Sequence, residues 1–143
     1  IESYKRALAI NPNEMIAANN LAAVYAEHDK GNLDEAVRLA QGVVQQNPDQ
    51  AGFADTLGWV YYKKGLHAAA VEQLQRAVNK SVAMKGDNAL YRFHLGMALA
   101  GANRKADARR ELDTALRLAE QEAARGAKPF AYADEARRTL ASL

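Results

Sequence analysis

Three histidines are the side chains of this 143-residue chain that are best suited to metal or acid–base chemistry. His28, His67 and His94 lie far apart in the sequence. None of them has a second ligand four residues away, which a metal pair on one helix would require. The pattern therefore favours histidines at a surface or at a helix interface, and it predicts no metal site.

Other catalytic chemistry finds little support in the residue types. The chain has no cysteine, which excludes a thiolate metal site and a disulfide framework. The acidic pairs at 34–35 and 134–135 stand near expected helix starts, where negative charge favours the helix dipole. The glycine-containing stretches HDKGN and MKGDN are typical of turns, and no serine lies in a nucleophile context. We therefore predict a protein that is not an enzyme and has no cofactor.

The charge balance narrows the class of partner. Nineteen Lys and Arg against seventeen Asp and Glu leave a formal net charge of +2, too small to indicate a nucleic-acid or membrane surface. No apolar run approaches the roughly 18 residues of a spanning helix, so we expect no membrane insertion by this segment. The missing initial Met suggests a piece of a longer protein. The absence of cysteine does not separate cytoplasm from periplasm.

The stretch DTLGWVYYKKG, residues 55–65, combines a glycine with three aromatic side chains. Gly58 costs about 1 kcal/mol relative to Ala inside a helix, so it indicates a packing or functional reason. Leu57 and Tyr61 share one helical face with it. The other face carries Asp55, Trp59, Tyr62 and Lys63. We expect the first face to be core and the second to be available to a partner.

The elements around this stretch repeat. Abundant Ala and only three prolines predict an all-helical chain. LGWVYYKKGLHAAAVEQLQRAV aligns with LGMALAGANRKADARRELDTAL, so that Gly58 matches Gly96 and Ala70 matches Ala108. A third copy, LAAVYAEHDKGNLDEAVRLAQGVVQQNP, matches after two extra turn residues. A small-residue helix, a turn and a second helix thus recur at about 34 residues.

This pattern resembles the tetratricopeptide repeat family, whose signature is L-G-x2-Y, then A-x3-F, then P. The resemblance covers nearly the whole chain. The departures are local, with Ala22 at the Gly position, Leu99 at the Tyr position, and Leu74, Ala40 and Leu112 at the large aromatic position. It implies an all-α, right-handed superhelical solenoid of antiparallel helix pairs with about eight helices.

The family's layout divides the chain into five parts. Residues 1–14 are expected to be the second helix of a truncated repeat. Full repeats are expected over 15–50, 51–88 and 89–122, and the second of these has a lengthened second helix that Gly86 and Asp87 stop. Residues 123–143 read as a C-terminal capping helix, which covers the last apolar face of a solenoid.

The resemblance also implies a function and a site. Members of the family bind extended or helical peptides in a concave groove that their first helices line. Carried over by position, the peptide-binding residues are Asn19 and Asn20 in the first full repeat, Asp55, Trp59, Tyr62 and Lys63 in the second, and Phe93, His94 and Met97 in the third. Ala23 also falls on the groove lining of the first full repeat. Trp and Tyr are typical interface anchors. The alternative is that Trp59 and Phe93 pack against a neighbouring helix.

Some family members hold a peptide carboxylate with Lys, Asn and Arg side chains on three first helices. The corresponding positions here are Asn19, Ala23, Thr56, Leu90 and His94, so that clamp is not reproduced. A groove with aromatic side chains and Met instead favours an apolar or aromatic-bearing segment. We therefore predict a protein-interaction scaffold with a protein or peptide partner.

Two further expectations concern an alternative function and the cellular location. The alternative function is self-assembly through the ends or faces of the solenoid, which would make a homo-oligomer. The reason is that the sequence begins in the middle of a repeat. The stretches NNLA, YRFHLGMALA and ADEARRTLASL also resemble, more weakly, the C-terminal part of bacterial multi-repeat lipoproteins linked to exopolysaccharide export and exosortase sorting. That resemblance points to the bacterial cell envelope or periplasm, while a cytoplasmic location stays open.

Overall fold

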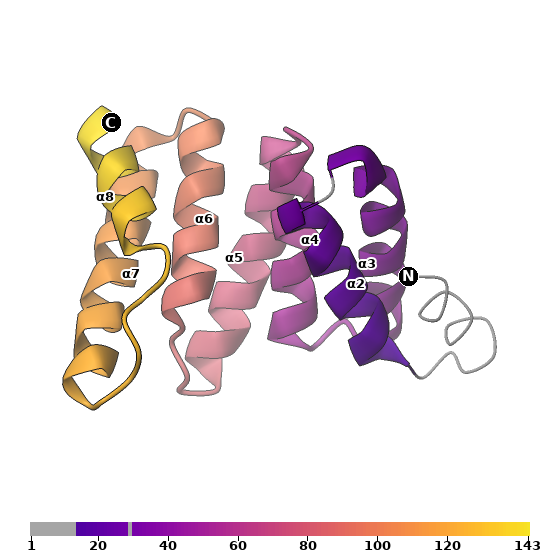
Figure 1. Ribbon diagram of the computed structural model, residues 1–143, viewed down its shortest axis with the longest axis horizontal. Coiled ribbons are helices and arrows are strands. Elements are labelled where there is room, and N and C mark those ends of the chain that lie inside the picture. The colour runs from indigo at the N-terminus through magenta and orange to yellow at the C-terminus, as the bar shows by residue number, and fades with distance from the viewer. Residues whose placement is uncertain (1–13, 29) are drawn as a thin grey trace.

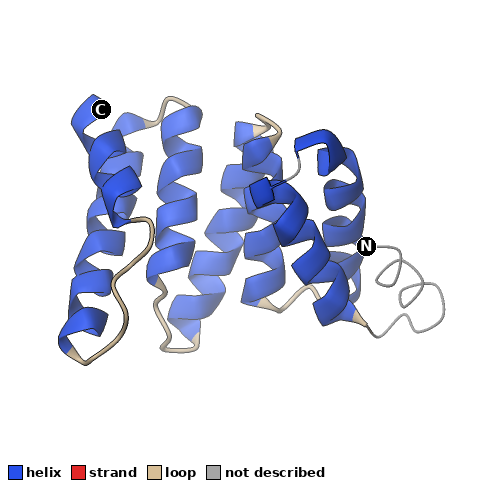
Figure 2. Cartoon of the chain, viewed as in Figure 1, coloured by secondary structure: helices blue, strands red, loops and turns tan. Residues whose placement is uncertain are grey.

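The computed structural model describes residues 14–28 and 30–143, and this part of the chain is helical throughout, with no strand (Figure 2). Its α-helices are α2 (Met15–His28), α3 (Leu33–Gln46), α4 (Ala51–Lys63), α5 (His67–Ala83), α6 (Ala89–Gly101), α7 (Lys105–Ala124) and α8 (Ala133–Ser142), and a 3₁₀ turn, η1 (Lys30–Asn32), precedes α3. The predicted all-α fold is confirmed. The helix expected over residues 1–14 lies outside the described residues, apart from Glu14.

The helices stand side by side in a row of hairpins (Figure 1). The hairpins pair α2 with α3, α4 with α5 and α6 with α7, and the two helices of each hairpin pack together. The first helices α2, α4 and α6 also contact one another in sequence, and α8 contacts both α6 and α7 at the end of the row. The chain is thus a helical solenoid in which α2, α4, α6 and α8 form one layer.

Glycines in α4 and α6 set how closely the second and third hairpins close. A Cβ on Gly58 would lie 2.5 Å from Leu74 Cγ and 3.1 Å from the Leu74 backbone N in α5. At Gly96 the same atom would lie 2.7 Å from the Leu112 side chain in α7. Real Cβ contacts do not come so close, so the interhelical distance depends on the missing side chain. The predicted packing role of both glycines is confirmed.

Four helices end with the same hydrogen-bond pattern. After α4, Leu66 N donates to Tyr61 O, and after α5 Gly86 N donates to Ser81 O. Equivalent bonds follow α6 and α7, as in the Schellman motif. The motif places one residue at positive φ, and these residues are Gly65, Lys85, Asn103 and Gly126. At the end of α5 the left-handed residue is thus Lys85, one position before the glycine that was expected to stop the helix.

Replacing Lys85 by glycine is expected to raise the free energy of unfolding by about 0.5–1 kcal/mol. Lys85 has φ 58°, a conformation that costs a side chain roughly 1–2 kcal/mol, and the extra freedom of glycine in the unfolded chain offsets part of the gain. Urea denaturation measures the change. Gly65→Ala, at φ 81°, is the matched reversal and should lower stability by a similar amount. A loss of stability in Lys85→Gly would contradict the assignment of Lys85 to the left-handed position of a Schellman motif.

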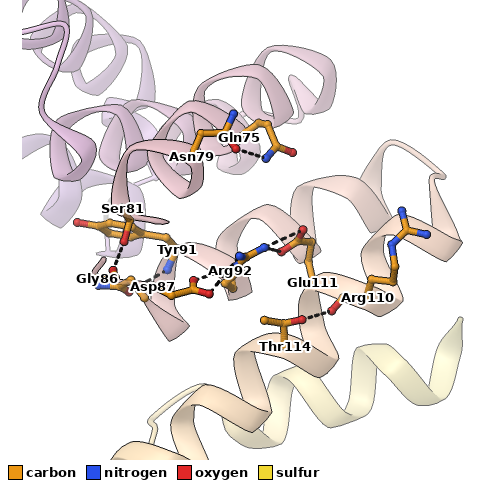
Figure 3. Close-up of polar contacts among 11 residues, drawn as sticks. Gln75, Asn79, Ser81, Gly86, Asp87, Tyr91, Arg92, Arg110, Glu111 and Thr114 are labelled. Carbon is orange, nitrogen blue, oxygen red and sulfur yellow. Dashed lines mark hydrogen bonds and ion pairs between the residues drawn. The ribbon is translucent and has the colours of Figure 1, made fainter. Parts of the chain in front are cut away.

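A polar cluster joins the turn after α5 to the next hairpin (Figure 3). The Arg92 guanidinium donates to both carboxylate oxygens of Asp87, at 2.9 and 3.1 Å, and to both of Glu111, at 2.9 and 3.2 Å. The hydrogen bond to Asp87 is the main cause that raises the pKa of Arg92 above its ordinary value. Bidentate pairs of this kind fix geometry, so the cluster holds α6 against α7 and has a structural explanation.

Candidate functional site

A cavity of about 200 Å³ lies where three first helices meet the segment before α8. Its walls come from α2, α4 and α6 and from Tyr132. The lining residues are Ala23, Ala26, Glu27, Asp55, Thr56, Trp59, Leu90, His94 and Tyr132. The cavity thus spans successive hairpins and no single repeat could form it.

Trp59 is a fixed wall of the cavity. Its indole Nε1 donates a hydrogen bond of 2.5 Å to Glu27 Oε1 on α2, and its side chain is 5% exposed. The ring stacks on His94 of α6 at a centroid distance of 4.0 Å and on Tyr62 at 4.6 Å. Lys63 Nζ lies 5.0 Å from the ring centroid, a cation–π distance. Neighbours on three helices therefore hold Trp59 in place.

Asp55 and His94 form a buried pair beside Trp59. His94 Nδ1 lies 2.8 and 3.0 Å from the two carboxylate oxygens of Asp55, and Asp55 and His94 are 6% and 5% exposed, respectively. A carboxylate can only accept a hydrogen bond, so this contact requires the form of His94 that carries a proton on Nδ1. The pair links α4 to α6, and its separation of 39 residues is one more than the 38-residue offset between those two repeats.

Burial and nearby carboxylates both act on the tyrosines at this site. Burial raises the pKa of the Tyr132 hydroxyl, and the negative charges of Glu27, Glu135 and Asp55 raise it further. Burial and the charge of Glu135 likewise raise the pKa of Tyr62. These shifts have the same sign because burial and nearby carboxylates both disfavour a phenolate. The carboxylates that act on Tyr132 include Glu27 and Asp55, which also line the cavity.

The segment between α7 and α8 covers part of the first-helix layer. The Phe93 ring stacks on Tyr132 at 4.9 Å and meets the edge of Phe130 at 6.0 Å. Phe93 is completely buried as a result. Because Tyr132 also lines the cavity, the C-terminal segment sets one edge of the site.

The structure separates the nine residues that sequence reasoning proposed for the groove. Buried are Asp55, Trp59, Phe93, His94 and Met97, partly buried are Asn19, Tyr62 and Lys63, and exposed is Asn20. Only Asp55, Trp59 and His94 line the cavity. Fewer side chains of α4 are available to a partner protein than predicted. Glu27 of α2 binds Trp59, and His94 of α6 pairs with Asp55.

Sequence reasoning missed Glu27 and Tyr132 as members of this site. Glu27 lies 32 residues before Trp59, whereas their two repeats are offset by 36 residues. Glu27 therefore stands one helical turn after the position in α2 that is equivalent to Trp59, and this spacing was the sequence signal for the contact. Tyr132 lies within residues 123–143, for which the sequence predicted only a capping helix. Ala23, which the resemblance placed in the groove lining, also lines the cavity, as do Thr56 and Leu90, two positions of the carboxylate clamp.

Two other hollows are weaker candidates for the functional site. A cavity of about 340 Å³ lies between α7 and the start of α8, with Leu116, Pro129 and Phe130 in its wall, and is the gap that the long connection leaves. A surface hollow of about 370 Å³ lies along α5 between Arg76 and Ala83. Neither brings successive first helices together.

Metal binding and membrane insertion find no support in the described part of the chain. Across residues 14–28 and 30–143, no group of three or more His, Cys, Asp or Glu side chains could hold a metal ion. No helix there is both long and apolar enough to cross a bilayer.

Comparison with known proteins identifies the family. A family model described as tetratricopeptide repeat matches residues 1–51, 29–84 and 56–123, which together cover most of the chain. No curated protein matches the chain significantly. The matches agree with the helical hairpins and with the glycine contacts that close them. The chain therefore belongs to the tetratricopeptide repeat family.

Proposed function

We propose that this chain binds a peptide or helical segment of a partner protein on the layer of first helices, at the cavity beside Trp59. Repeats of this family generally mediate protein–protein interactions, and the family is typically non-catalytic. The observation that carries the proposal is the cavity that α2, α4 and α6 form together. Clefts with apolar walls and a few convergent polar groups are the usual form of a binding site.

The size of the cavity suits one anchoring side chain of a longer segment. Its volume of about 200 Å³ is below the roughly 300–1,000 Å³ of pockets that enclose a drug-sized ligand. Asn20 is exposed on α2, and Asn19, Tyr62 and Lys63 are partly exposed. These four residues offer further contacts to the partner outside the cavity. Phe93 and Met97 are left out of the proposed surface because they are buried.

The test uses a substitution that fills the cavity with a longer side chain. Peptides are selected from a random display library on the immobilised chain, and their affinity is then measured with purified protein by the fluorescence of Trp59, the one tryptophan in the sequence. Ala23→Gln places a longer side chain in the cavity from α2. We expect it to weaken peptide binding by about tenfold or more, since occupation of the central anchor pocket removes the dominant contact.

The matched control is Val24→Gln on the same helix. Val24 is 51% exposed and does not line the cavity, so this variant should bind the peptides as the wild type does. Far-ultraviolet circular dichroism checks that both variants stay helical. Equal binding by wild type and Ala23→Gln, or failure to select any binding peptide, would refute the proposed function.

A further inference from the structure

We propose that the cavity beside Trp59 selects a cationic side chain, arginine foremost, from the bound segment. This inference rests on the proposed function and specifies the chemistry of its anchor. It follows from the hydrogen-bonding capacity, the charge and the walls of the cavity.

Three side-chain donors of the lining are already used within the protein, and the Tyr132 hydroxyl can donate or accept. Trp59 Nε1 donates to Glu27 and His94 Nδ1 donates to Asp55. The Thr56 hydroxyl donates to the Gly52 carbonyl at 3.1 Å. A carboxylate has about four lone-pair sites, so Glu27 and Asp55 retain acceptor capacity after these bonds. The lining therefore offers acceptors, and it suits a ligand group that is rich in N–H donors.

The charge of the lining has one sign. Glu27 and Asp55 are its two carboxylates, and no Lys or Arg is among the nine lining residues. Glu135 adds to the negative field at Tyr132. Lys63 lies over the Trp59 ring and is not part of the lining. A carboxylate ligand would meet repulsion here, whereas a cation is attracted.

The walls favour arginine over lysine. Ala23, Ala26 and Leu90 provide apolar surface for the aliphatic part of a long side chain. A guanidinium is planar, presents five donors, stacks on aromatic rings and is more weakly hydrated than an ammonium. Tyr132 supplies an aromatic ring at the same cavity, whereas the Trp59 ring is already stacked on Tyr62 and His94. An arginine head between Tyr132 and the carboxylates would be matched in shape and in charge.

The experiment uses the display-selected peptides. We expect them to share an arginine, and we replace it by citrulline, which keeps the shape and loses the charge. With wild-type protein this replacement should weaken binding by about 10–100-fold, since charge-assisted hydrogen bonds are roughly twice as strong as neutral ones. Glu27→Gln should weaken the arginine peptide and reduce its advantage over the citrulline peptide. The amide oxygen that this substitution introduces can still accept from the Trp59 indole, so the wall is retained.

The matched control is Glu72→Gln, which removes one exposed carboxylate on α5, outside the cavity. It should leave both affinities unchanged. Peptides that bind and are blocked by Ala23→Gln, but lack a basic residue or tolerate citrulline, would overturn this inference while the proposed function stands. An equal effect of Glu27→Gln and Glu72→Gln would show that the arginine binds elsewhere. Failure to select any peptide would refute both proposals.

Discussion

Phe93→Ala is expected to lower the free energy of unfolding by about 3–5 kcal/mol, the range for loss of a buried large aromatic side chain. Phe93 is completely buried in the first-helix layer. Its ring meets Trp59 at 6.0 Å, Phe130 at 6.0 Å and Tyr132 at 4.9 Å. Because both C-terminal aromatics rest on this ring, the variant should also loosen the segment before α8.

Urea denaturation followed by circular dichroism measures the loss, and hydrogen exchange at residues 127–132 reports on the segment. Phe130→Ala removes the same kind of side chain from the partly buried side of the contact and should cost less, about 1–2 kcal/mol. A Phe93→Ala protein with wild-type stability but weakened binding of display-selected peptides would restore Phe93 to the groove, where the family resemblance had placed it.

Gly58→Leu is expected to cost about 3 kcal/mol, at the upper end of the range for overpacking a core. A Cβ alone would lie 2.5 Å from Leu74 Cγ, and Leu74 is completely buried, so it has no free space to move into. The backbone N of Leu74 at 3.1 Å limits relief by a change of rotamer. The hairpin of α4 and α5 must therefore open, and urea denaturation would record the loss.

Gly42→Ala is the matched control for this substitution. Gly42 lies inside α3, and nothing stands within 4 Å of the position that its Cβ would take. The change should raise stability by up to about 1 kcal/mol, because alanine is the better helix former. If Gly58→Leu and Gly42→Ala had the same sign, close approach would not explain the glycine of the repeat.

The solenoid could be predicted from the sequence because its decisive contacts are local and repeated. Gly58 and Leu74 lie 16 residues apart, and Gly96 and Leu112 repeat the same pair. A hairpin closes such contacts between neighbouring helices, so small residues at a fixed spacing mark it directly. Comparison of the copies was therefore enough to assign these glycines to packing.

The candidate site could be predicted only in part because each of its contacts joins different repeats. A helical wheel grouped Asp55, Trp59 and Tyr62 on one face of α4, but the structure buries the first two and packs Tyr62 against His67 of α5. It could not show that Glu27 would bind the indole or that His94 would pair with Asp55, 32 and 39 residues away. These partners occur once each and have no counterpart in the repeat pattern.

The sequence by itself thus determined the helices, their pairing and the glycines that close the hairpins, since helical periodicity and repetition encode contacts within and between adjacent helices. Only the tertiary structure decided which side of α4 remains open and what chemistry it offers. Stacking of the hairpins buries Trp59, joins Asp55 to His94 and brings Tyr132 from the C-terminal segment to the cavity. Those outcomes depend on the distance between successive first helices, a property of the assembled layer that no single helix carries.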